Sequence, residues 1–317
     1  NMKNKLQFNK NIIIAPLGLI ALIVLFTFTS PYFFDVGNFM NITRQASINI
    51  IIAAGMTVVI LTGGIDLSVG SIVALSACTI AQLNQQAGIN IWVATGIGVV
   101  VAILCGFING LIICYGNIPA FIATLGMQGI ARGVALIITS GYPSQTFGDE
   151  FRWIGNSNVF GIPFMFLVAM AVMLIVAYFL KYSLQGRHIY AVGGNEEATK
   201  YSGIDVKRTK ILAYTIMGVC CGIAAVVMAS RINSAPPSAG GGYELDAIAA
   251  VVIGGTSLVG GEGSIWGSLL GAFIMAVLTN GLNLLNVNSN IQTALIGAVI
   301  IFMVYIKNMG DIKKLGR

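Results

Sequence analysis

The sequence predicts an all-α fold, a polytopic membrane bundle of about ten spanning helices with breaks in two places. Three observations support this prediction: 56% of the 317 residues are hydrophobic, only 9% are charged, and the apolar residues form long continuous runs. A soluble domain carries roughly 25% charged residues, so this chain cannot give a globule a polar surface. The composition excludes a disordered chain and argues against a soluble enzyme or a nucleic-acid-binding protein.

Ten apolar runs approach the roughly 20 residues that a helix needs to cross a bilayer. They cover residues 12–29, 46–62, 68–84, 91–115, 119–140, 163–181, 209–229, 245–259, 264–286 and 290–306. The runs are continuous and do not alternate, which argues against a β-barrel. No small-residue cleavage site follows the first run, so we expect it to remain as a span. The whole chain, 1–317, is expected to form one transmembrane domain.

The positions of Lys and Arg predict the orientation, because these residues gather in cytoplasmic loops. Three regions are basic: the N-terminus with Lys3, Lys5 and Lys10, the segment 181–210 with six Lys and Arg, and the C-terminus after residue 306. Six predicted spans precede residue 181 and four follow residue 210. Because both numbers are even, all three basic regions, and therefore both termini, are expected in the cytoplasm.

Two glycine-rich joints interrupt the apolar runs without a charged loop: residues 63–70 and residues 254–264. Non-helical backbone at membrane depth is tolerated only inside protein or beside a water-filled cavity. Broken helices in corresponding parts of two halves point to a transport pathway, and a tight interhelical turn is the alternative. Asp66 or Ser68 can cap the helix after the first joint, and Ser264 the helix after the second.

Pairs of glycines four residues apart predict where helices pack closely, because small residues let backbones approach. The pairs are Gly106 and Gly110, Gly129 and Gly133, and Gly267 and Gly271. Such spacing also arises by chance in a chain with 39 glycines. It predicts a tight bundle and no particular function.

Polar side chains inside the apolar runs are candidates for lining a translocation pathway. They are Asp66, Ser68, Asn109, Gln128, Arg132, Asn280 and Asn283. A charge within a span costs roughly 2.5–3.5 kcal/mol and usually faces the bundle interior or a cavity. The alternative is interhelical hydrogen bonding, worth less than about 1 kcal/mol for each bond. For Asp66, a role as helix cap or ion-pair partner is the favoured alternative.

The connection 230–247 is expected on the extracytoplasmic side, and its Pro and Gly residues predict a structured turn. Arg231, Glu244 and Asp246 bracket this connection and are candidates for docking a partner. An ordinary loop is the alternative.

No catalytic constellation is visible in the sequence. His188 is the only His, so a multi-His metal site within the chain is excluded. The chain also lacks the glycine-rich phosphate loop that ends in Lys and Ser or Thr. We therefore expect no enzyme activity, no metal and no cofactor in this chain, and ATP hydrolysis would require another chain.

A short exposed helix is expected at residues 196–202, within the cytoplasmic segment 182–208 of the basic region. Asn195 is a suitable N-cap, Glu196 and Glu197 fall in the first turn, and Gly203 can end the helix. Seven residues are too few for a helix that is stable alone. A docking partner is one explanation for such a helix, and a well-capped loop helix is the other.

Several stretches together resemble the permease subunit of binding-protein-dependent ABC sugar importers, in particular the ribose permease family. They read GMTVVILTGGIDLSVGSIVALS (55–76), PAFIATLG (119–126), GRHIYAVGGNEEATKYSGI (186–204), YELDAIAAVVIGGTSLVGGEG (243–263) and TNGLNLL (279–285). The resemblance implies that two permease copies pair in the cytoplasmic (inner) membrane. It also implies that ABC ATPase subunits bind ATP and Mg²⁺, and that an extracytoplasmic sugar-binding protein delivers the ligand.

The resemblance extends to the cytoplasmic coupling motif of the family, which reads Glu-Ala-Ala followed later by Gly. Glu197, Ala198 and Gly203 match it, whereas Thr199 replaces the second Ala. The expected contact with the ATPase therefore consists of Asn195, Glu196, Glu197, Ala198, Tyr201, Ser202 and Gly203. The implied mechanism is a movement of this helix, driven by closure of the ATPase, that alternates access to the pathway.

The leading hypothesis is a permease subunit for a monosaccharide, with ribose or a related pentose as the favoured substrate. A hydrophobic amino-acid permease of the ABC class is one alternative. A secondary transporter or channel that acts alone is another, and Asp66 and Arg132 would be its basis for ion coupling.

Overall fold

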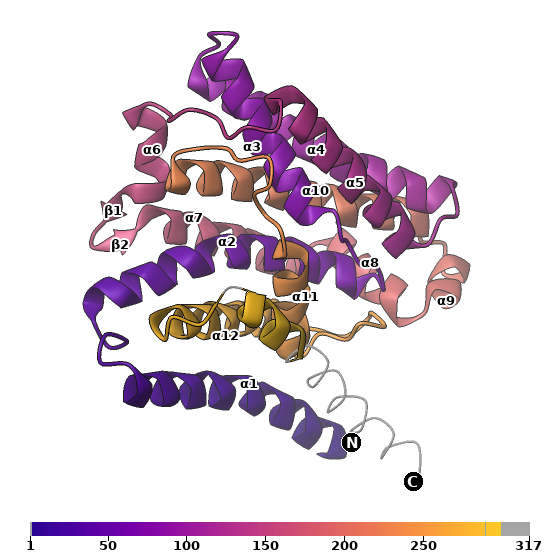
Figure 1. Ribbon diagram of the computed structural model, residues 1–317. Helices are drawn as coiled ribbons and strands as arrows, with labels where there is room; N and C mark the ends of the chain where they lie inside the picture. Colours follow the sequence, from indigo (N-terminus) through magenta and orange to yellow (C-terminus); the bar gives the residue numbers. More distant parts are fainter. Residues whose placement is uncertain (1, 289, 299–317) are drawn as a thin grey trace.

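The computed structural model describes residues 2–288 and 290–298, with side chains from residue 15 onward, and the described chain is a helical bundle (Figure 1). Its helices are α1 (Met2–Thr29), α2 (Val36–Leu61), α3 (Val69–Gln85), α4 (Ile91–Tyr115), α5 (Ala120–Thr139), α6 (Asp149–Asn156), α7 (Phe164–Tyr182), α8 (Leu184–Gly194), α9 (Glu196–Tyr201), α10 (Val206–Ile232), α11 (Tyr243–Ile253) and α12 (Ile265–Leu284). An antiparallel hairpin of β1 (Asn158–Val159) and β2 (Ile162–Pro163) separates α6 from α7. Residues 290–298 are also helical.

Six of the described helices, α2, α4, α5, α7, α10 and α12, are long and apolar enough to cross a membrane. The helix α3 has 17 residues, and α1 contains the apolar stretch Ala15–Thr29. The predicted span 290–306 lies partly outside the described residues. The mostly helical membrane architecture is therefore confirmed, whereas the number of ten spans stays a prediction.

The structure corrects the predicted span 245–259, because the helix at this place, α11, ends at Ile253 after 11 residues. Eleven residues extend about 16 Å, roughly half of the hydrocarbon thickness of a bilayer. Gly254 and Gly255 end the helix: Gly254 lies against the backbone of Gly267, and Gly255 adopts a positive φ of 91°. The element is thus a half-helix followed by the irregular backbone of the second joint.

The helices α2 and α10 form the centre of the bundle. The helix α10 packs against α2, α3 and α4, and α2 packs against α7, α11 and α12. In the most apolar stretch of α2, 83% of the residues are buried, whereas in that of α5 only 28% are buried. A helix that is apolar on all sides belongs in the interior, whereas α5 leaves a broad face uncovered within this chain.

Two of the three predicted glycine pairs are packing faces. Gly106 and Gly110 of α4 lie against the backbone of α10, and Gly267 and Gly271 of α12 lie against the backbone of α11. By contrast, a Cβ atom added at Gly129 or Gly133 of α5 would have no atom within 4 Å. The third pair therefore makes no close helix contact within the described chain.

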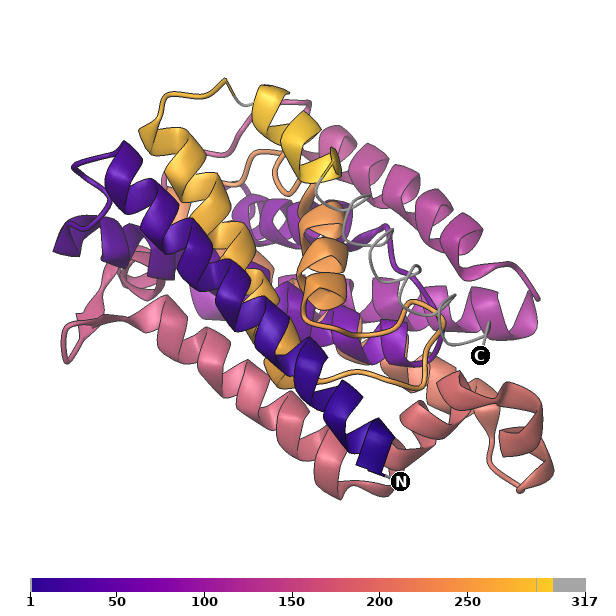
Figure 2. The same ribbon diagram turned by 90° about the horizontal axis from the view of Figure 1, so that it is seen from below.

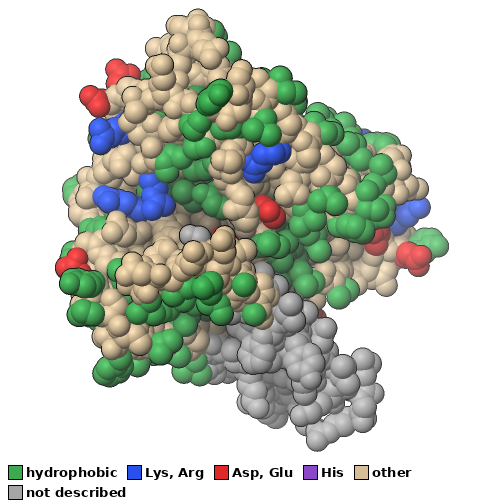
Figure 3. Space-filling model, viewed as in Figure 1, with side chains coloured by type: hydrophobic (Ala, Val, Ile, Leu, Met, Phe, Trp, Pro, Cys, Tyr) green, Lys and Arg blue, Asp and Glu red, His purple; other side chains and the backbone are tan. Residues whose placement is uncertain are grey.

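The bundle has two distinct ends. In Figure 1, α9 lies at the right-hand end, and α6 with the β-hairpin lies at the left-hand end. The view from below in Figure 2 shows α1 running across α12, against which it packs. On the face in Figure 3, most charged side chains lie toward the two ends, and hydrophobic side chains cover much of the surface between them. This distribution suits a molecule whose middle is surrounded by lipid.

Three segments that are far apart in the sequence meet at one glycine junction, formed by Gly63, Gly193, Gly260 and Gly261. The N–H of Gly261 in the second joint donates a hydrogen bond of 3.0 Å to the carbonyl of Leu61, where α2 ends at the first joint. A Cβ atom on Gly193, near the end of α8, would overlap that carbonyl oxygen. The backbones of both joints therefore touch each other and the segment that leads into α9.

We predict that Gly193→Ala destabilises the protein, because the added methyl group overlaps backbone atoms that cannot rotate away. Overpacking of this kind costs typically 1–3 kcal/mol, so the midpoint of thermal unfolding in detergent should fall by several degrees. The matched control is Gly194→Ala, where the added Cβ has no atom within 4 Å. Equal midpoints for the two variants would show that the close packing at Gly193 contributes nothing to stability.

Candidate functional site

A buried polar cluster holds the first joint in place. The Asp66 carboxylate accepts hydrogen bonds from the Ser68 N–H at 2.9 Å and from the Ser68 hydroxyl at 2.5 Å. The Asn109 side chain of α4 donates to the Ser68 hydroxyl at 2.9 Å. All three side chains are fully buried. Ser68 is the N-cap residue of α3 but makes no capping bond with its own side chain, and the Asp66 carboxylate accepts the N–H of Ser68 itself.

The backbone of the same joint is tied to two further helices. The carbonyl of Ile65 accepts hydrogen bonds from the Tyr214 hydroxyl of α10 at 3.3 Å and from the Thr124 hydroxyl of α5 at 3.4 Å. Irregular backbone in a membrane needs such partners, because no water is available to satisfy it. The first joint is thus connected to α4, α5 and α10 by polar contacts.

A second polar cluster joins α5 to the connection between α10 and α11. The Arg132 guanidinium donates to the carbonyls of Pro237 and Ala239, the latter at 2.8 Å. The Gln128 amide lies 3.5 Å from a carboxylate oxygen of Glu244. Glu244 was predicted as a docking residue, but in this structure it contacts Gln128, which was predicted to line the pathway. The contact lies where the connection enters α11.

The remaining pathway candidates lie elsewhere. Asn280 of α12 donates to the Asn38 side chain of α2 at 2.9 Å, and Asn283 accepts from Gln292 at 2.8 Å. Asn38 stands at the start of α2, at the end of the bundle that carries the hairpin. The seven candidates thus occupy three separate places in this chain, and their role as a lining stays a prediction.

The end of the bundle with α6 and the hairpin carries a basic pair that sequence reasoning missed. Arg44 of α2 donates to the Asn158 side chain of β1 at 3.1 Å, and its Nε atom has no hydrogen-bond partner among the described residues. Arg231, at the end of α10, lies close enough for the two guanidinium groups to repel each other. Asp246 is half-buried in the first turn of α11. In the sequence Arg44 is an isolated basic residue, which was only a weak indication of a functional site. The fold, and not the sequence, brings Arg44 close to Arg231.

At the opposite end, α9 confirms the predicted short helix, with one residue fewer at its end. The Asn195 side chain caps it by accepting the Ala198 N–H at 2.9 Å, and Gly203 follows with a positive φ of 81°. The seven expected contact residues, Asn195, Glu196, Glu197, Ala198, Tyr201, Ser202 and Gly203, are all exposed. Tyr201 is 89% exposed, which is unusual for an aromatic side chain in a soluble region and leaves it free for a partner.

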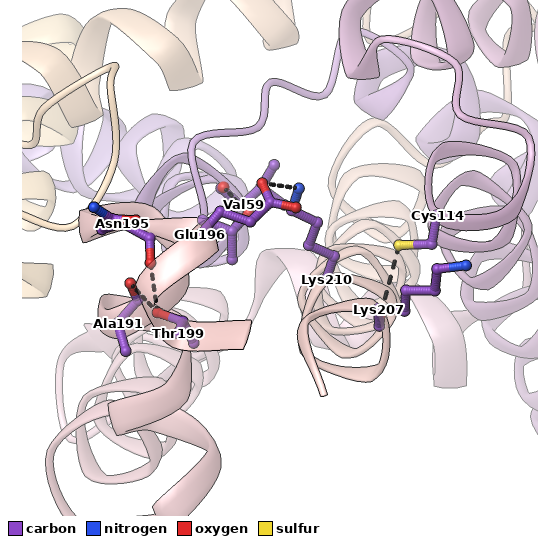
Figure 4. A network of polar contacts seen from close by, with 9 residues as sticks. Val59, Cys114, Ala191, Asn195, Glu196, Thr199, Lys207 and Lys210 are labelled. Atoms are coloured by element: carbon purple, nitrogen blue, oxygen red, sulfur yellow. Dashed lines mark hydrogen bonds and ion pairs between the residues drawn. The ribbon is translucent and has the colours of Figure 1, made fainter. Parts of the chain in front are cut away.

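Two side chains attach α9 to the bundle (Figure 4). The Thr199 hydroxyl, which is buried, donates to the carbonyls of Ala191 at 2.8 Å and Asn195 at 2.7 Å. The Lys210 ammonium of α10 lies 2.7 Å from the Glu196 carboxylate. Thr199 is the residue that departs from the family motif, and here its hydroxyl connects α9 to α8.

A polar pocket of about 310 Å³ lies between Lys210 and the first joint. Its lining includes Thr62, Gly63, Asn117, Lys210 and Tyr214. The attachment of α9 therefore adjoins the backbone whose position the Asp66 cluster fixes. Within the described residues, no group of three or more His, Cys, Asp or Glu side chains could hold a metal ion.

The long apolar helices and the two broken joints are features of membrane transport proteins. The chain belongs to the family described as branched-chain amino acid transport system / permease component, whose model matches residues 38–304. It is a multi-pass membrane protein.

Several curated relatives are named as permeases for a sugar. The chain is 44% identical to the ribose import permease protein RbsC of Escherichia coli (strain K12) over 296 residues, 92% of each chain. It is 43% identical to RbsC of Bacillus subtilis, over 91% of this chain and 90% of that protein. Identity to the D-allose transport system permease protein AlsC of Escherichia coli is 39%, over 89% and 87%. No solved structure gives a significant match.

We predict that Asp66→Leu destabilises the protein more than Asp66→Asn does. Asparagine keeps an oxygen that can accept both bonds from Ser68, whereas leucine leaves the buried N–H and hydroxyl without an acceptor, at a cost of about 1–3 kcal/mol for each group. The midpoint of thermal unfolding in detergent should fall clearly for the leucine variant and little for the asparagine variant. Equal losses would mean that the negative charge, and not the acceptor, is what the joint requires.

Proposed function

We propose that this chain is the permease subunit of an ATP-driven importer for a monosaccharide, with ribose or a related pentose as substrate. The observation that carries the proposal is the exposed, capped helix α9, which is attached to the bundle beside both broken joints. The ribose permeases at 43–44% identity support the substrate class. We infer that the protein lies in the cytoplasmic (inner) membrane with both termini in the cytoplasm, and the distribution of Lys and Arg supports this inference.

We assign the coupling of transport to ATP hydrolysis to α9 and to its two contacts with the bundle, through Thr199 and through Glu196 with Lys210. An ABC ATPase subunit binds ATP and Mg²⁺ and contacts the exposed face of α9, including Glu197 and Tyr201. A displacement of α9 acts on α8 through Thr199 and on α10 through Glu196 and Lys210. Because Gly193 at the end of α8 touches Leu61, just before the first joint, and Gly261 of the second joint, the displacement reaches the irregular backbone of the second joint directly.

The pathway for the sugar is assigned to the space between two copies of the permease. The outer face of α5 supports this assignment, because Gly129 and Gly133 make no close contact within the described chain and Gln128 and Arg132 are only half-buried beside them. Amide and guanidinium groups suit the hydroxyl groups of a sugar. A face with these groups would be costly against lipid, and a second copy would cover it.

Docking of the extracytoplasmic sugar-binding protein is assigned to the hairpin end of the bundle. Arg231 and the neighbouring Arg44 provide positive charge there that no carboxylate in the described residues neutralises at ion-pair distance. Acidic side chains of a binding protein would complement this pair. Asp246 lies on the same connection, and Glu244 is assigned to the α5 contact.

A hydrophobic amino acid is the second candidate substrate, because the matching family model carries the description of branched-chain amino acid transport. The sugar is preferred, since the relatives of highest identity given above are sugar permeases. The polar character of the two clusters also suits a hydrophilic solute better than an apolar side chain.

Transport by the reconstituted importer tests the function. In proteoliposomes that contain the chain, its ATPase and its binding protein, we expect ATP-dependent uptake of labelled ribose that excess leucine does not reduce. Leaving out the ATPase should abolish uptake. Competition by leucine would support the amino-acid alternative, and uptake without the ATPase would support a transporter that acts alone.

Charge reversal tests the assigned coupling route. The variants Glu196→Lys and Lys210→Glu each place like charges together, and we expect uptake per ATP hydrolysed to fall about fivefold, the effect of roughly 1 kcal/mol. The double variant restores the opposite charges and should recover at least half of the wild-type ratio. As a control, Arg208→Glu disturbs only the local pair with Asp205 in the first turn of α10. Without recovery in the double variant, the attachment of α9 through Lys210 is not part of the route.

A further inference from the structure

A long groove lies on the side of the bundle between the end of α7 and the start of α12. Its volume is about 870 Å³. Leu174, Ile175 and Leu180 of α7 line it together with Trp266 of α12. Leu174 and Ile175 are more than half exposed in this chain. The groove is thus an apolar surface that faces outward from a membrane-spanning helix.

One basic side chain stands at the end of this groove. Lys181, in the last turn of α7, is exposed, and its ammonium lies 5.1 Å from the centre of the Tyr182 ring. The two ion pairs formed by the described residues involve other cations, Arg208 and Lys210. Lys181 therefore carries a positive charge that no carboxylate of the described chain neutralises at ion-pair distance.

The residues around Lys181 place this end of the groove at the level of the lipid headgroups. The rings of Tyr178 and Tyr182 lie with their centres 5.0 Å apart, tilted by 39°. Trp266 is half exposed on the opposite wall. Tyr and Trp gather at membrane–water interfaces, and a lysine there extends its charge toward the headgroups. Lys181 belongs to the basic segment that predicts the cytoplasmic side, where anionic lipids attract such charges.

We propose that this groove binds one anionic phospholipid of the cytoplasmic leaflet. Its phosphate pairs with Lys181, and an acyl chain lies along Leu174, Ile175 and Trp266. The combination of a single positive charge with a long apolar floor matches a charged headgroup joined to a hydrocarbon chain. A soluble anion would leave the apolar floor uncovered, and a second protein copy would have to present an acidic residue at Lys181.

The site adjoins the second joint. Gly263 and Ser264 line the groove, and the Tyr190 hydroxyl of α8 donates to the Gly263 carbonyl at 3.3 Å. A lipid in the groove therefore contacts the joint that forms part of the glycine junction. The occupant would stabilise the position of that backbone relative to α8.

Fluorescence quenching of Trp266 tests the proposal with the full chain in bilayers. Replacing Trp92 and Trp153 by Phe leaves Trp266 as the only fluorescent indole. Phosphatidylglycerol or phosphatidylcholine with brominated acyl chains then serves as the quencher. We expect about fivefold preference for phosphatidylglycerol, which Lys181→Gln reduces to nearly equal quenching, since one lysine near an anionic surface contributes that factor. Glycerol phosphate in the buffer should not change the quenching.

The matched control is Lys207→Gln, because Lys207 also lies over a tyrosine ring, that of Tyr115 at 4.6 Å, but away from the groove. This variant should keep the preference for phosphatidylglycerol. Equal quenching by both lipids in the parent protein would overturn the proposal and indicate ordinary surrounding lipid. Absence of quenching by either lipid would overturn it as well, because protein, such as a second copy, would then cover the groove. Displacement by glycerol phosphate would assign the charge to a soluble anion instead.

Discussion

The hydrogen bond from the Gly261 N–H to the Leu61 carbonyl marks the contact on which the arrangement depends. Lipid is as apolar as leucine, so burial of apolar side chains gives helices little reason to associate in a membrane, and close backbone packing must supply the attraction. At the glycine junction the backbones of the three segments are in direct contact, because no side chains lie between them. The same requirement explains the pairs Gly106 with Gly110 and Gly267 with Gly271, which hold α4 to α10 and α12 to α11.

The polar side chains follow a second rule, which is that buried polar atoms need partners. Asp66, Ser68 and Asn109 bond to one another at a joint, although one Asp66 oxygen and the Asn109 side-chain oxygen have no hydrogen-bond partner among the described residues. Gln128 and Arg132 instead lie half-buried on the least covered long helix, α5. The first group therefore shapes the backbone, and under the proposed function the second group is the part of the predicted lining that a solute between two copies would reach.

Local signals in the sequence predicted local features well. The glycine runs predicted both joints, and Asn195, Glu196 and Gly203 predicted α9 within one residue, because capping depends on neighbours in the chain. The sequence could not predict that Gly193 packs against Leu61 and Gly261, or that Arg44 lies near Arg231. Both depend on tertiary contacts that no single segment encodes. The spacing of Gly129 and Gly133 wrongly predicted a close helix contact within this chain. Such spacing shows that a helix has a face of small residues, but it does not show which element covers that face. Helix α8 and the hairpin were missed because their segments lack a strong periodic pattern.

The attachment of α9 has a consequence for a copy that has not assembled. A six-residue helix with one buried side chain, Thr199, has few contacts to lose on opening, so its local unfolding requires far less free energy than unfolding of the bundle. Proteases cleave such transiently open segments in proportion to their open population. Under the proposed function, a free permease would therefore expose a cleavable segment on the surface assigned to the ATPase, and assembly would protect that segment. Assembled and orphan copies would differ in lifetime without any dedicated degradation signal.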